Sequence, residues 1–500
     1  MDSLPLAVHT AAQVRALERH AIETLGIASY SLMTRAGVAA FAALRNCWPS
    51  ARRVVVVCGP GNNGGDGYVL ARLALEEKLD LVLMAIADPA QLEGDARRAC
   101  DDFIAAGGAV QPWSDRHVRD ADVIVDAIFG TGLSRDIDVE TAKRIRSIND
   151  STAAVFALDV PSGLHADSGA TLGAAIVAAR TMAFIGLKLG FYLGVGADHT
   201  GAVMFDALGA PSDALASIEP AATRIAADTL VTMLPPRRRT THKGAQGRVL
   251  VLGGGLGMAG AARMAAEAAL RVGAGLVTVA TRAENVAAIV GARPELICRG
   301  VEAADELKDL IDRADVLALG PGLGQDEWAK DLLDAALEAA SGSSKLAIID
   351  ADGLNLLAKH PRANPHWILT PHPGEAARLL GSTTQEIQAD RLRSAQAIAE
   401  RYQATVVLMG AGRCIVSSNE RPCVCDQGNP GMATAGMGDV LTGVIAGIAA
   451  QTGDRIGAAR AGVLAHAMAG DMAARRGERG LLATDLFDHL QSCVNPTQHS

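Results

Sequence analysis

One local pattern recurs along most of this chain: a short apolar run, a glycine-rich turn and an alanine-rich helical stretch. Its first instance joins the apolar run Val54–Cys58 through a glycine-rich segment to the helix-like run Tyr68–Lys78. Strands that alternate with longer helical segments predict parallel sheets with helices on both faces, so we expect an α/β fold. Further strands are predicted at Leu81–Ile86, Val123–Ala127, Ala154–Asp159, Val249–Leu252, Leu276–Ala280, Val316–Leu319, Leu346–Ile349, Trp367–Leu369 and Thr405–Met409.

The pattern breaks between residues 207 and 236, a stretch that holds four prolines and precedes the basic run Arg237–Arg239. At about 150 residues per domain, the length favours two or three domains. We predict one domain over residues 1–215, a linker over 216–240 and a second domain over 241–500. A basic run is usually a solvated linker. A phosphate contact stays open here, because Thr241–Gly244 follows directly.

Composition excludes several function classes. The net charge of −9 and the aromatic content of 3% argue against a nucleic-acid-binding surface. No secretory signal is visible, and no apolar run approaches the 18 or so residues of a membrane span. The eight cysteines are scattered without zinc-ligand spacing, as is typical of free thiols in a reducing compartment. We predict a cytoplasmic homo-oligomer that binds small molecules and has no nucleic-acid or membrane partner.

The first glycine-rich segment satisfies the pattern GxGxxG at Gly59, Gly61 and Gly64, and Asp88 lies about 20 residues further on. This spacing fits a dinucleotide-binding turn, in which glycines let the backbone approach a pyrophosphate at a helix N-terminus. The pattern alone is weak evidence, and the absence of a Walker lysine argues against a P-loop.

Three polar residues within this segment, Asn62, Asn63 and Asp66, are more informative. Side-chain carbonyls and a carboxylate in one loop can ligate a hard cation or hydrogen-bond ribose hydroxyls. The alternative is an Asn-Gly turn followed by a helix-capping aspartate.

Ordered motifs over residues 10–210 resemble the YjeF N-terminal family, the NAD(P)H-hydrate epimerases. They are Gly61–Arg72, Val125–Leu133, Leu158–Leu164, Lys188–Phe191 and Gly194–Asp198. The resemblance implies a Rossmann-like three-layer α/β/α domain.

The resemblance also assigns site residues. Asn63, Asp126 and Ser162 would hold K⁺ through oxygen ligands, and Lys188 would lie near the substrate. Asp126 is either a general acid–base or only a K⁺ ligand, and the sequence leaves both readings open. The residues implied to bind the hydrated dinucleotide are Asn62, Asn63, Gly64, Gly65, Asp66, Gly130, Thr131, Gly132, Leu133, Ser134, Arg135, Asp136 and Asp159.

The second half holds another weak GxGxxG at Gly253–Gly260 and a longer small-residue segment at Gly428–Asp439, before an apolar helix from Val440. Small residues before a helix leave backbone N–H groups free to neutralise phosphate charge. Asp439 could then take a proton from a hydroxyl that attacks a nucleotide's terminal phosphate. Its alternative role is a plain N-cap.

Gly-Met-Gly-Asp in this setting resembles the GxGD of the ribokinase-like superfamily. The fuller pattern is similar to the ADP/ATP-dependent NAD(P)H-hydrate dehydratases, the YjeF C-terminal family. The matching segments are His242–Gly244, Gly247–Arg248, Ala266–Leu276, Gly320–Gly324, Asp350–Asn355, Thr370–Glu375, Asn429–Asp439 and the tail Leu481–Leu486. The resemblance implies a ribokinase-like α/β domain.

Carried over from this family, Ala259, Gly322, His372 and Asp439 would contact the S-form hydrate. Gly438 and the loop Met409, Gly410, Ala411, Gly412 and Arg413 would bind the nucleotide. That loop normally reads Leu-Lys-Gly-Ala-Gly-Thr, whereas residues 408–413 read Leu-Met-Gly-Ala-Gly-Arg. Arg413 could restore the lost positive charge and Met409 cannot, so the preference between ADP and ATP stays open.

Together these resemblances predict a bifunctional repair enzyme for hydrated nicotinamide dinucleotides. One domain would interconvert the R and S hydrates, and the other would phosphorylate the S-form hydroxyl from ADP or ATP so that phosphate can leave. K⁺ is implied by the resemblance and Mg²⁺ by the nucleotide chemistry. The main alternative is a ribokinase-type small-molecule kinase fused to a dinucleotide-binding domain. A scaffold module and a plain dehydrogenase are weaker alternatives.

Overall fold

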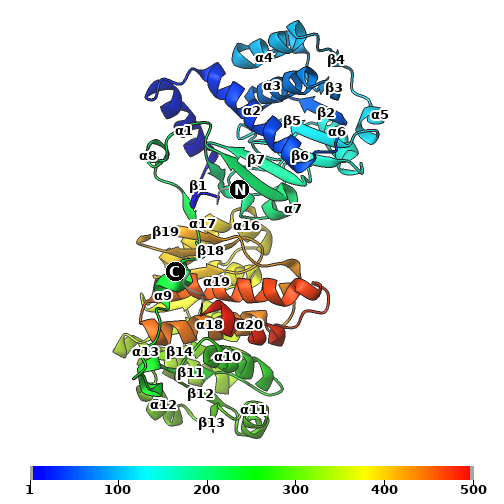
Figure 1. Cartoon of the computed structure of the whole chain (residues 1–500). Helices are drawn as coiled ribbons and strands as arrows, with labels where there is room; N and C mark the ends of the chain where they lie inside the picture. Colours follow the sequence, from blue (N-terminus) through cyan, green and yellow to red (C-terminus); the bar gives the residue numbers. More distant parts are fainter. Residues whose placement is uncertain (1–3, 496–500) are drawn as a thin grey trace. The chain divides into compact units, whose positions relative to one another are not determined.

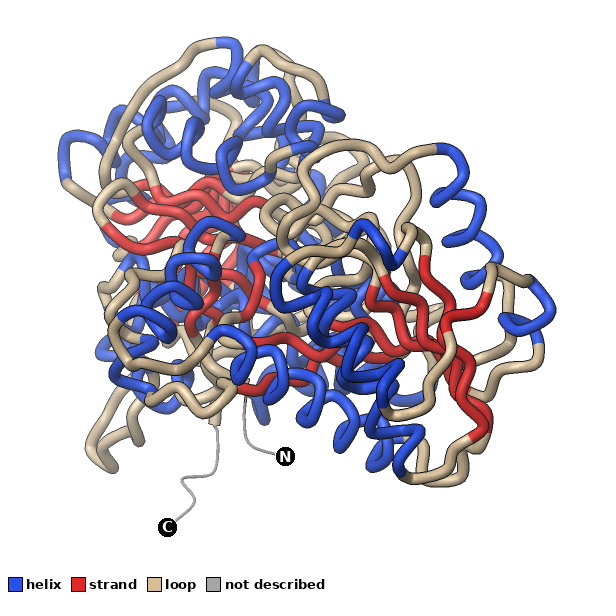
Figure 2. Tube along the Cα trace, turned by 90° about the horizontal axis from the view of Figure 1, so that it is seen from above, coloured by secondary structure: helices blue, strands red, loops and turns tan. Residues whose placement is uncertain are grey.

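The computed structural model describes residues 4–495, and the chain divides into two compact units, Met1–Thr223 and Arg224–Ser500. Figures 1 and 2 show that each unit has a sheet with helices packed against it. The division falls inside the predicted linker. That segment also contains the short elements β10 (Ala222–Arg224) and α9 (Thr229–Met233). The domain bounds given above stay a prediction.

Unit 1 is built on a seven-stranded, fully parallel sheet of order β4-β3-β2-β5-β6-β7-β9. Its order reverses between β2 and β5, which creates a crevice at the carboxyl ends of these two strands. The strands are β2 (Arg53–Cys58), β3 (Asp80–Ala85), β4 (Val110–Gln111), β5 (Val123–Ala127), β6 (Ala154–Leu158), β7 (Arg180–Phe184) and β9 (Ala202–Asp206), with β1 (Ala7–His9) paired to β8 (Leu187–Lys188) outside this sheet.

Helices cover both faces of that sheet. Along β2, Val54 and Val56 pack in one core with α2, α3 and α4, whereas Val55 and Val57 pack in another with α5 and α6. This alternation follows from the two-residue period of a strand, and it confirms the predicted three-layer α/β/α arrangement. The helices are α1 (Ala11–Glu23), α2 (Ser29–Cys47), α3 (Asn62–Glu76), α4 (Gly94–Ala105), α5 (Asp115–Arg119), α6 (Val139–Asn149), α7 (Gly196–Thr200) and α8 (Ser212–Leu215).

Unit 2 has strand order β13-β12-β11-β14-β15-β16-β17-β18-β19. Neighbours are parallel from β13 to β17 and antiparallel from β17 to β19. The strands are β11 (Arg248–Leu252), β12 (Leu276–Thr281), β13 (Ile297–Gly300), β14 (Val316–Leu319), β15 (Leu346–Ile349), β16 (Trp367–Leu369), β17 (Thr405–Leu408), β18 (Arg413–Ser417) and β19 (Glu420–Cys425).

The central strands of unit 2 are buried on both faces, as expected for a parallel sheet between helices. Alanine-rich helices α10 and α18 pack closely in its core, together with α19 and α20. The helices are α10 (Ala259–Arg271), α11 (Val286–Ala292), α12 (Lys308–Arg313), α13 (Glu327–Ser343), α14 (Ala351–Lys359), α15 (Pro373–Leu380), α16 (Thr384–Ala389), α17 (Arg391–Tyr402), α18 (Met437–Thr452), α19 (Arg455–Ala473) and α20 (Phe487–Cys493).

Most sequence predictions of strands are confirmed to within two residues. The predicted start of the helix Tyr68–Lys78 was wrong. Helix α3 begins at Asn62, six residues before the predicted Tyr68, so the polar residues of the glycine-rich segment lie in its first turns. The glycines there permit close packing. A Cβ at Gly64 would lie 2.1 Å from the carbonyl oxygen of Gly59, and one at Gly67 would lie 2.6 Å from Cβ of Ala127.

Within residues 4–495, no helix is long and apolar enough to cross a membrane. All eight cysteines are free thiols.

Candidate active sites

Unit 1 contains a cavity of about 770 Å³ near the carboxyl ends of β2 and β5, where the strand order reverses. Most of the residues predicted to bind the hydrated dinucleotide line it. From the predicted set, the lining includes Asn62, Asn63, Asp66, Gly130, Thr131, Gly132, Leu133, Ser134, Arg135, Asp136 and Asp159. Gly64 and Gly65 are buried behind it in α3. Asp88 caps the short helix Pro89–Gln91 instead of lining the cavity.

Asp159 is held at the cavity wall by two contacts. Its Oδ1 lies 2.5 Å from Nζ of Lys188, and its Oδ2 accepts a hydrogen bond of 2.9 Å from the Thr131 N–H. Its backbone has φ +63°, an unusual value for a residue other than glycine. A Cβ at Gly130 would lie 2.5 Å from Oδ2 of Asp159, so a side chain at this position would displace the carboxylate.

Lys188 is fully buried and also donates a hydrogen bond of 3.0 Å to the carbonyl oxygen of Phe184. Its contact with the cavity wall is therefore the ion pair with Asp159.

Asp126, at the end of β5, is fully buried. Its carboxylate accepts hydrogen bonds from Oγ of Ser162 at 2.6 Å, from the Ser162 N–H at 2.8 Å and from the Ile128 N–H at 3.2 Å. Burial raises the pKa of Asp126 to about 6, although these hydrogen bonds favour the charged form.

The predicted K⁺ ligands offer the donor set that such a hard cation prefers: an amide oxygen, a carboxylate and a hydroxyl. Asn63 is buried, and within the described part of the chain neither its Oδ1 nor its Nδ2 has a hydrogen-bond partner. A buried amide oxygen without a partner is costly unless a ligand satisfies it. These residues therefore fit a K⁺ ion.

Sequence reasoning missed Glu18, on the N-terminal helix α1, which also lines the cavity. Burial, followed by the charge of Asp159, raises the pKa of Glu18 to about 7. Burial, followed by the charges of Asp159 and Glu18, raises the pKa of Asp66 well above its usual range. No motif contains Glu18; only the fold brings it to the site.

In unit 2, the predicted substrate-contacting residues follow the carboxyl ends of β11, β14 and β16. The Gly255 N–H donates a hydrogen bond of 2.7 Å to the carbonyl oxygen of Gly322. Gly322 has φ +56°, and a Cβ there would lie 2.9 Å from Met258, the residue before Ala259. The structure thus brings Ala259 and Gly322 together at the start of α10.

Asp439 lies in the first turn of α18, whose N-cap is Gly436 with φ +89°. Its alternative role as the N-cap is therefore wrong, because the helix begins three residues before the predicted Val440. Burial, with the charges of Asp350 and Asp352, raises the pKa of Asp439 to about 7.

Asp350 is the buried acid beneath this turn. Its carboxylate accepts hydrogen bonds from the hydroxyls of Thr370 at 2.9 Å and Thr442 at 2.8 Å. A Cβ at Gly438 would lie 3.5 Å from Cε of Met409 and 3.8 Å from Oδ2 of Asp350. The predicted nucleotide-contacting residues Gly438 and Met409 therefore meet at the start of α18.

His372 caps helix α15, and 51% of its side chain is exposed. Its Nδ1 accepts a hydrogen bond from the Gly374 N–H at 3.0 Å, which leaves the proton of the neutral ring on Nε2, 3.3 Å from Oε1 of Glu375. Burial lowers the pKa of His372 and raises that of Glu375 to about 8. Both shifts disfavour the charged forms that an ion pair between these two side chains would need.

The predicted nucleotide loop rests on a residue that sequence reasoning also missed. Arg391 is 1% exposed, and its Nη2 donates to the carbonyl oxygens of Met409 at 2.8 Å, Leu408 at 3.3 Å and Gly412 at 3.4 Å. Arg413 begins β18, and burial lowers the pKa of both guanidinium groups. Arg391 is thus a buried cation at this loop, although residue 409 is not lysine, whereas the partly buried guanidinium group of Arg413 lies beside Gly428 and Met432.

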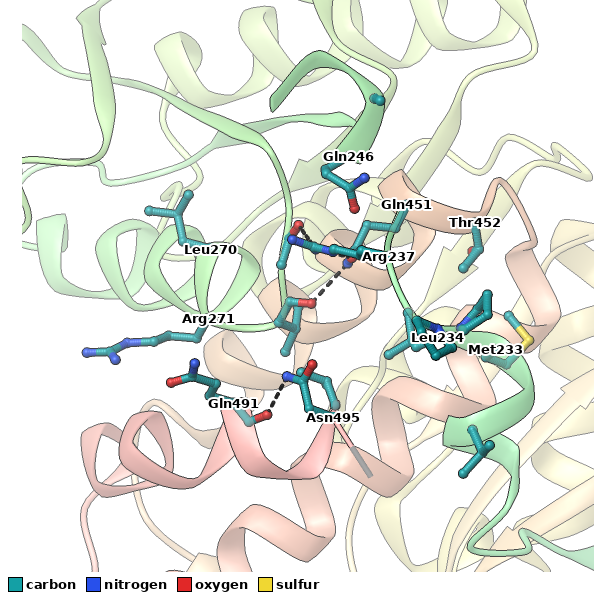
Figure 3. A pocket seen from close by; sticks show the side chains of 17 residues that line it. Met233, Leu234, Arg237, Gln246, Leu270, Arg271, Gln451, Thr452, Gln491 and Asn495 are labelled. Atoms are coloured by element: carbon teal, nitrogen blue, oxygen red, sulfur yellow. Dashed lines mark hydrogen bonds between the residues drawn. The ribbon is translucent and has the colours of Figure 1, made fainter. Parts of the chain in front are cut away.

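A second cavity, of about 690 Å³, lies at the opposite ends of the unit 2 strands, beside residues that precede β11 and β12 (Figure 3). Its lining includes none of the predicted site residues. Arg237, from the basic run, donates hydrogen bonds of 2.6 Å to the Gly273 carbonyl oxygen and to Oε1 of Gln451.

Comparisons with known proteins match each of the two units to a different family. Residues 29–190 match the model of the YjeF-related protein N-terminus, and residues 249–492 match that of NAD(P)H-hydrate dehydratase. A bifunctional NAD(P)H-hydrate repair enzyme from Coxiella burnetii is 47% identical, over 97% of this chain and 98% of its own length. One from Escherichia coli is 45% identical, over 99% of this chain and 95% of its own.

Solved structures support the fold of unit 2. A ribokinase-like superfamily protein from Enterococcus faecalis has a TM-score of 0.51 at 30% identity, covering 54% of this chain and 95% of its own. A hypothetical protein from Streptococcus mutans has a TM-score of 0.51 at 33% identity, covering 54% and 98%. With two family models in the expected order and near-complete coverage by these relatives, the chain belongs to the bifunctional NAD(P)H-hydrate repair enzymes.

Proposed function

We propose that this chain returns both epimers of hydrated NADH and NADPH to the reduced dinucleotides. Unit 1 interconverts the R and S hydrates, and unit 2 dehydrates the S hydrate with ADP or ATP as co-substrate. The observation that carries the proposal is that one chain contains two sites, each with an acid whose pKa is raised by burial: the fully buried Asp126 in unit 1 and the partly buried Asp439 in unit 2. Such acids are suited to proton transfer near neutral pH.

In unit 1, Asn62, Asp66, Asp159 and the loop 130–136 hold the hydrated dinucleotide in the cavity. Asn63, Asp126 and Ser162 hold K⁺, which supplies positive charge next to the bound substrate. Gly130 leaves room for the carboxylate of Asp159, and Lys188 orients that carboxylate through their ion pair.

In unit 2, Ala259, Gly322 and His372 contact the S hydrate. Asp439 accepts the proton of the substrate hydroxyl while the hydroxyl oxygen attacks the terminal phosphate of the nucleotide. The phosphate then leaves with the former hydroxyl oxygen, and the neighbouring ring carbon loses a proton, so that the ring double bond forms. Phosphorylation makes this possible because phosphate is a far better leaving group than hydroxide. Backbone N–H groups at the start of α18 stabilise the negative charge of the phosphates.

The nucleotide lies against Gly438 and the loop 409–413. Arg391 orients that loop and, with Arg413, supplies the positive charge that lysine at position 409 would otherwise provide. Across residues 4–495, no group of three or more His, Cys, Asp or Glu side chains is arranged to hold a metal ion. Mg²⁺ enters with the nucleotide phosphates, as is common for this ion.

A cytoplasmic location fits the eight free cysteines. The homo-oligomer stays a prediction, which light scattering of the purified chain would test.

The test of the function adds purified protein to a mixture of R and S hydrates with ADP or ATP, and follows the return of dihydronicotinamide absorbance. Complete recovery, faster than spontaneous epimerisation allows, is expected. Recovery that stops at the S fraction would remove the epimerase activity from the proposal. Accumulation of a stable phosphorylated hydrate would favour the ribokinase-type kinase instead.

A further inference from the structure

The cavity of unit 1 holds more acidic groups than its cations balance. Five carboxyl groups line it: those of Asp136 and Asp138 are exposed, and those of Glu18, Asp66 and Asp159 are partly buried. Lys188 is fully buried beside the cavity, and its ion pair is with Asp159. Among the described residues, neither Glu18 nor Asp66 forms an ion pair with a buried cation.

The other charged or titratable groups at the cavity are exposed or neutral. Arg135, which is exposed, lines it from the loop 130–136. Arg15 also lines the cavity, from the helix that holds Glu18, but it is exposed and donates to the Thr131 carbonyl oxygen at 3.3 Å. His9 is buried, and burial followed by the charge of Lys188 lowers its pKa to about 4, so it is neutral. Two carboxylates in one partly desolvated cavity disfavour each other's ionisation. The pair Glu18 and Asp66 therefore retains a proton near neutral pH.

Epimerisation of a hydrated ring carbon needs such a pair. The hydroxyl must be removed from one face of the ring and restored on the other. One group must donate a proton to the departing oxygen, and another must accept a proton from the incoming water. A cavity with one protonated and one ionised carboxyl group supplies both at once.

We propose that Glu18 is a catalytic proton-transfer residue of the epimerisation, with Asp66 as its partner on the opposite face of the ring. Glu18 protonates the substrate hydroxyl, the C–O bond breaks, and water leaves as the ring nitrogen lone pair forms a C=N⁺ bond. A water molecule then adds to the other face, the electron pair returns to nitrogen, and the extra proton goes to Asp66. Solvent exchange resets the two carboxyl groups, and no oxidant or reductant is consumed.

This inference rests on the proposed epimerase function. The test is Glu18→Gln in the full chain, with Glu23→Gln, an exposed residue of the same helix, as the matched control. Mixed hydrates are incubated with ADP or ATP, so that a fast phase reports dehydration of the S hydrate and a slow phase reports epimerisation. General acid–base groups contribute about 100- to 10,000-fold, so Glu18→Gln should lower the enzymatic slow phase at least about 100-fold. Its fast phase and the control should match the wild type.

The possible outcomes distinguish failure of the proposed epimerase function from failure of the role of Glu18. If the wild type shows no slow phase beyond the spontaneous rate, the epimerase function itself fails. If the wild type has this phase and Glu18→Gln keeps it, only the role of Glu18 is overturned.

Two further measurements exclude a merely structural role. Glu18→Asp should restore part of the slow phase, and the wild-type rate should change with pH around 7 in a way that Glu18→Gln lacks. A pH profile shared by both proteins would overturn the assignment. Epimerisation in ¹⁸O-water should introduce label into the hydroxyl of the product, and retention of the original oxygen would overturn the C–O cleavage step.

Discussion

Replacing Arg391 with glutamine should weaken nucleotide binding in unit 2 and leave unit 1 unaffected. Arg391 is fully buried, and its guanidinium group donates to three carbonyl oxygens around the loop 409–412. Glutamine retains a polar head that can reach fewer of these acceptors, and it carries no charge. The fold should persist, because the substitution also removes the cost of burying a cation.

The geometry sets the size of the effect. Among the bonds to the loop, the one to the Met409 carbonyl oxygen, at 2.8 Å, has full hydrogen-bond length, whereas those at 3.3 and 3.4 Å are long and contribute little. The bond from Nη1 to Oε1 of Gln388, at 2.5 Å, lies outside the loop. One hydrogen bond from a charged group contributes about 1.5–3 kcal/mol. At about 1.4 kcal/mol per factor of ten, the nucleotide KM should rise about 10- to 100-fold.

The assay measures dehydration of the S hydrate against nucleotide concentration and, in the same protein, epimerisation as an internal control. Arg393→Gln, an exposed residue of the same helix, is the matched variant and should keep the wild-type KM. Arg391→Lys should lie between the two, since it keeps the charge and loses the planar fork. An unchanged nucleotide KM in Arg391→Gln would refute the role of this residue at the loop.

Two further predictions concern the buried acids. Asp439 must be ionised to accept a proton, and its pKa is raised to about 7. The dehydration rate should therefore fall as the pH drops through about 7. Asp439→Asn should abolish dehydration while epimerisation continues. A dehydration rate that stays flat from pH 8 to 6 would contradict this role. Asp126→Asn should remove both epimerisation and its stimulation by K⁺, whether Asp126 is a base or only a ligand. Conversion from R to S at the wild-type rate would exclude both roles.

The sequence predicted the strands well because a parallel strand that is buried on both faces must be a short, continuous apolar run. It failed at the start of α3, where glycine and asparagine have low helix propensity. Tertiary packing overrides that propensity. Gly64 and Gly67 in the first turns of α3 permit contact with the loop after β2 and with β5 that a side chain would block. The glycines of the GxGxxG pattern thus serve close packing within the protein as much as the approach of a ligand.

The site was predicted only where residues stand within a motif. Asn62, Asp66 and Asp159 follow strand ends, and the strand order brings them together. Glu18 and Arg391 have no such signal, because each lies on an ordinary amphipathic helix far along the chain from its partners. Only the packing of α1 shows that Glu18 lines a cavity, and only the packing of α17 shows that Arg391 contacts the loop.

The most direct test of the account is complementation between two chains that each lack one of the two activities. Asp439→Asn and Asp126→Asn are each added to mixed R and S hydrates with nucleotide, and then both are added together. Separate active sites in the two units predict almost no recovery with the first variant. The second should recover only the S fraction, beyond which recovery proceeds at the spontaneous rate. The mixture should recover all of the dinucleotide at nearly the wild-type rate. A mixture that stops at the S fraction, or complete rapid recovery by either variant alone, would contradict the assignment of the two activities to these two sites.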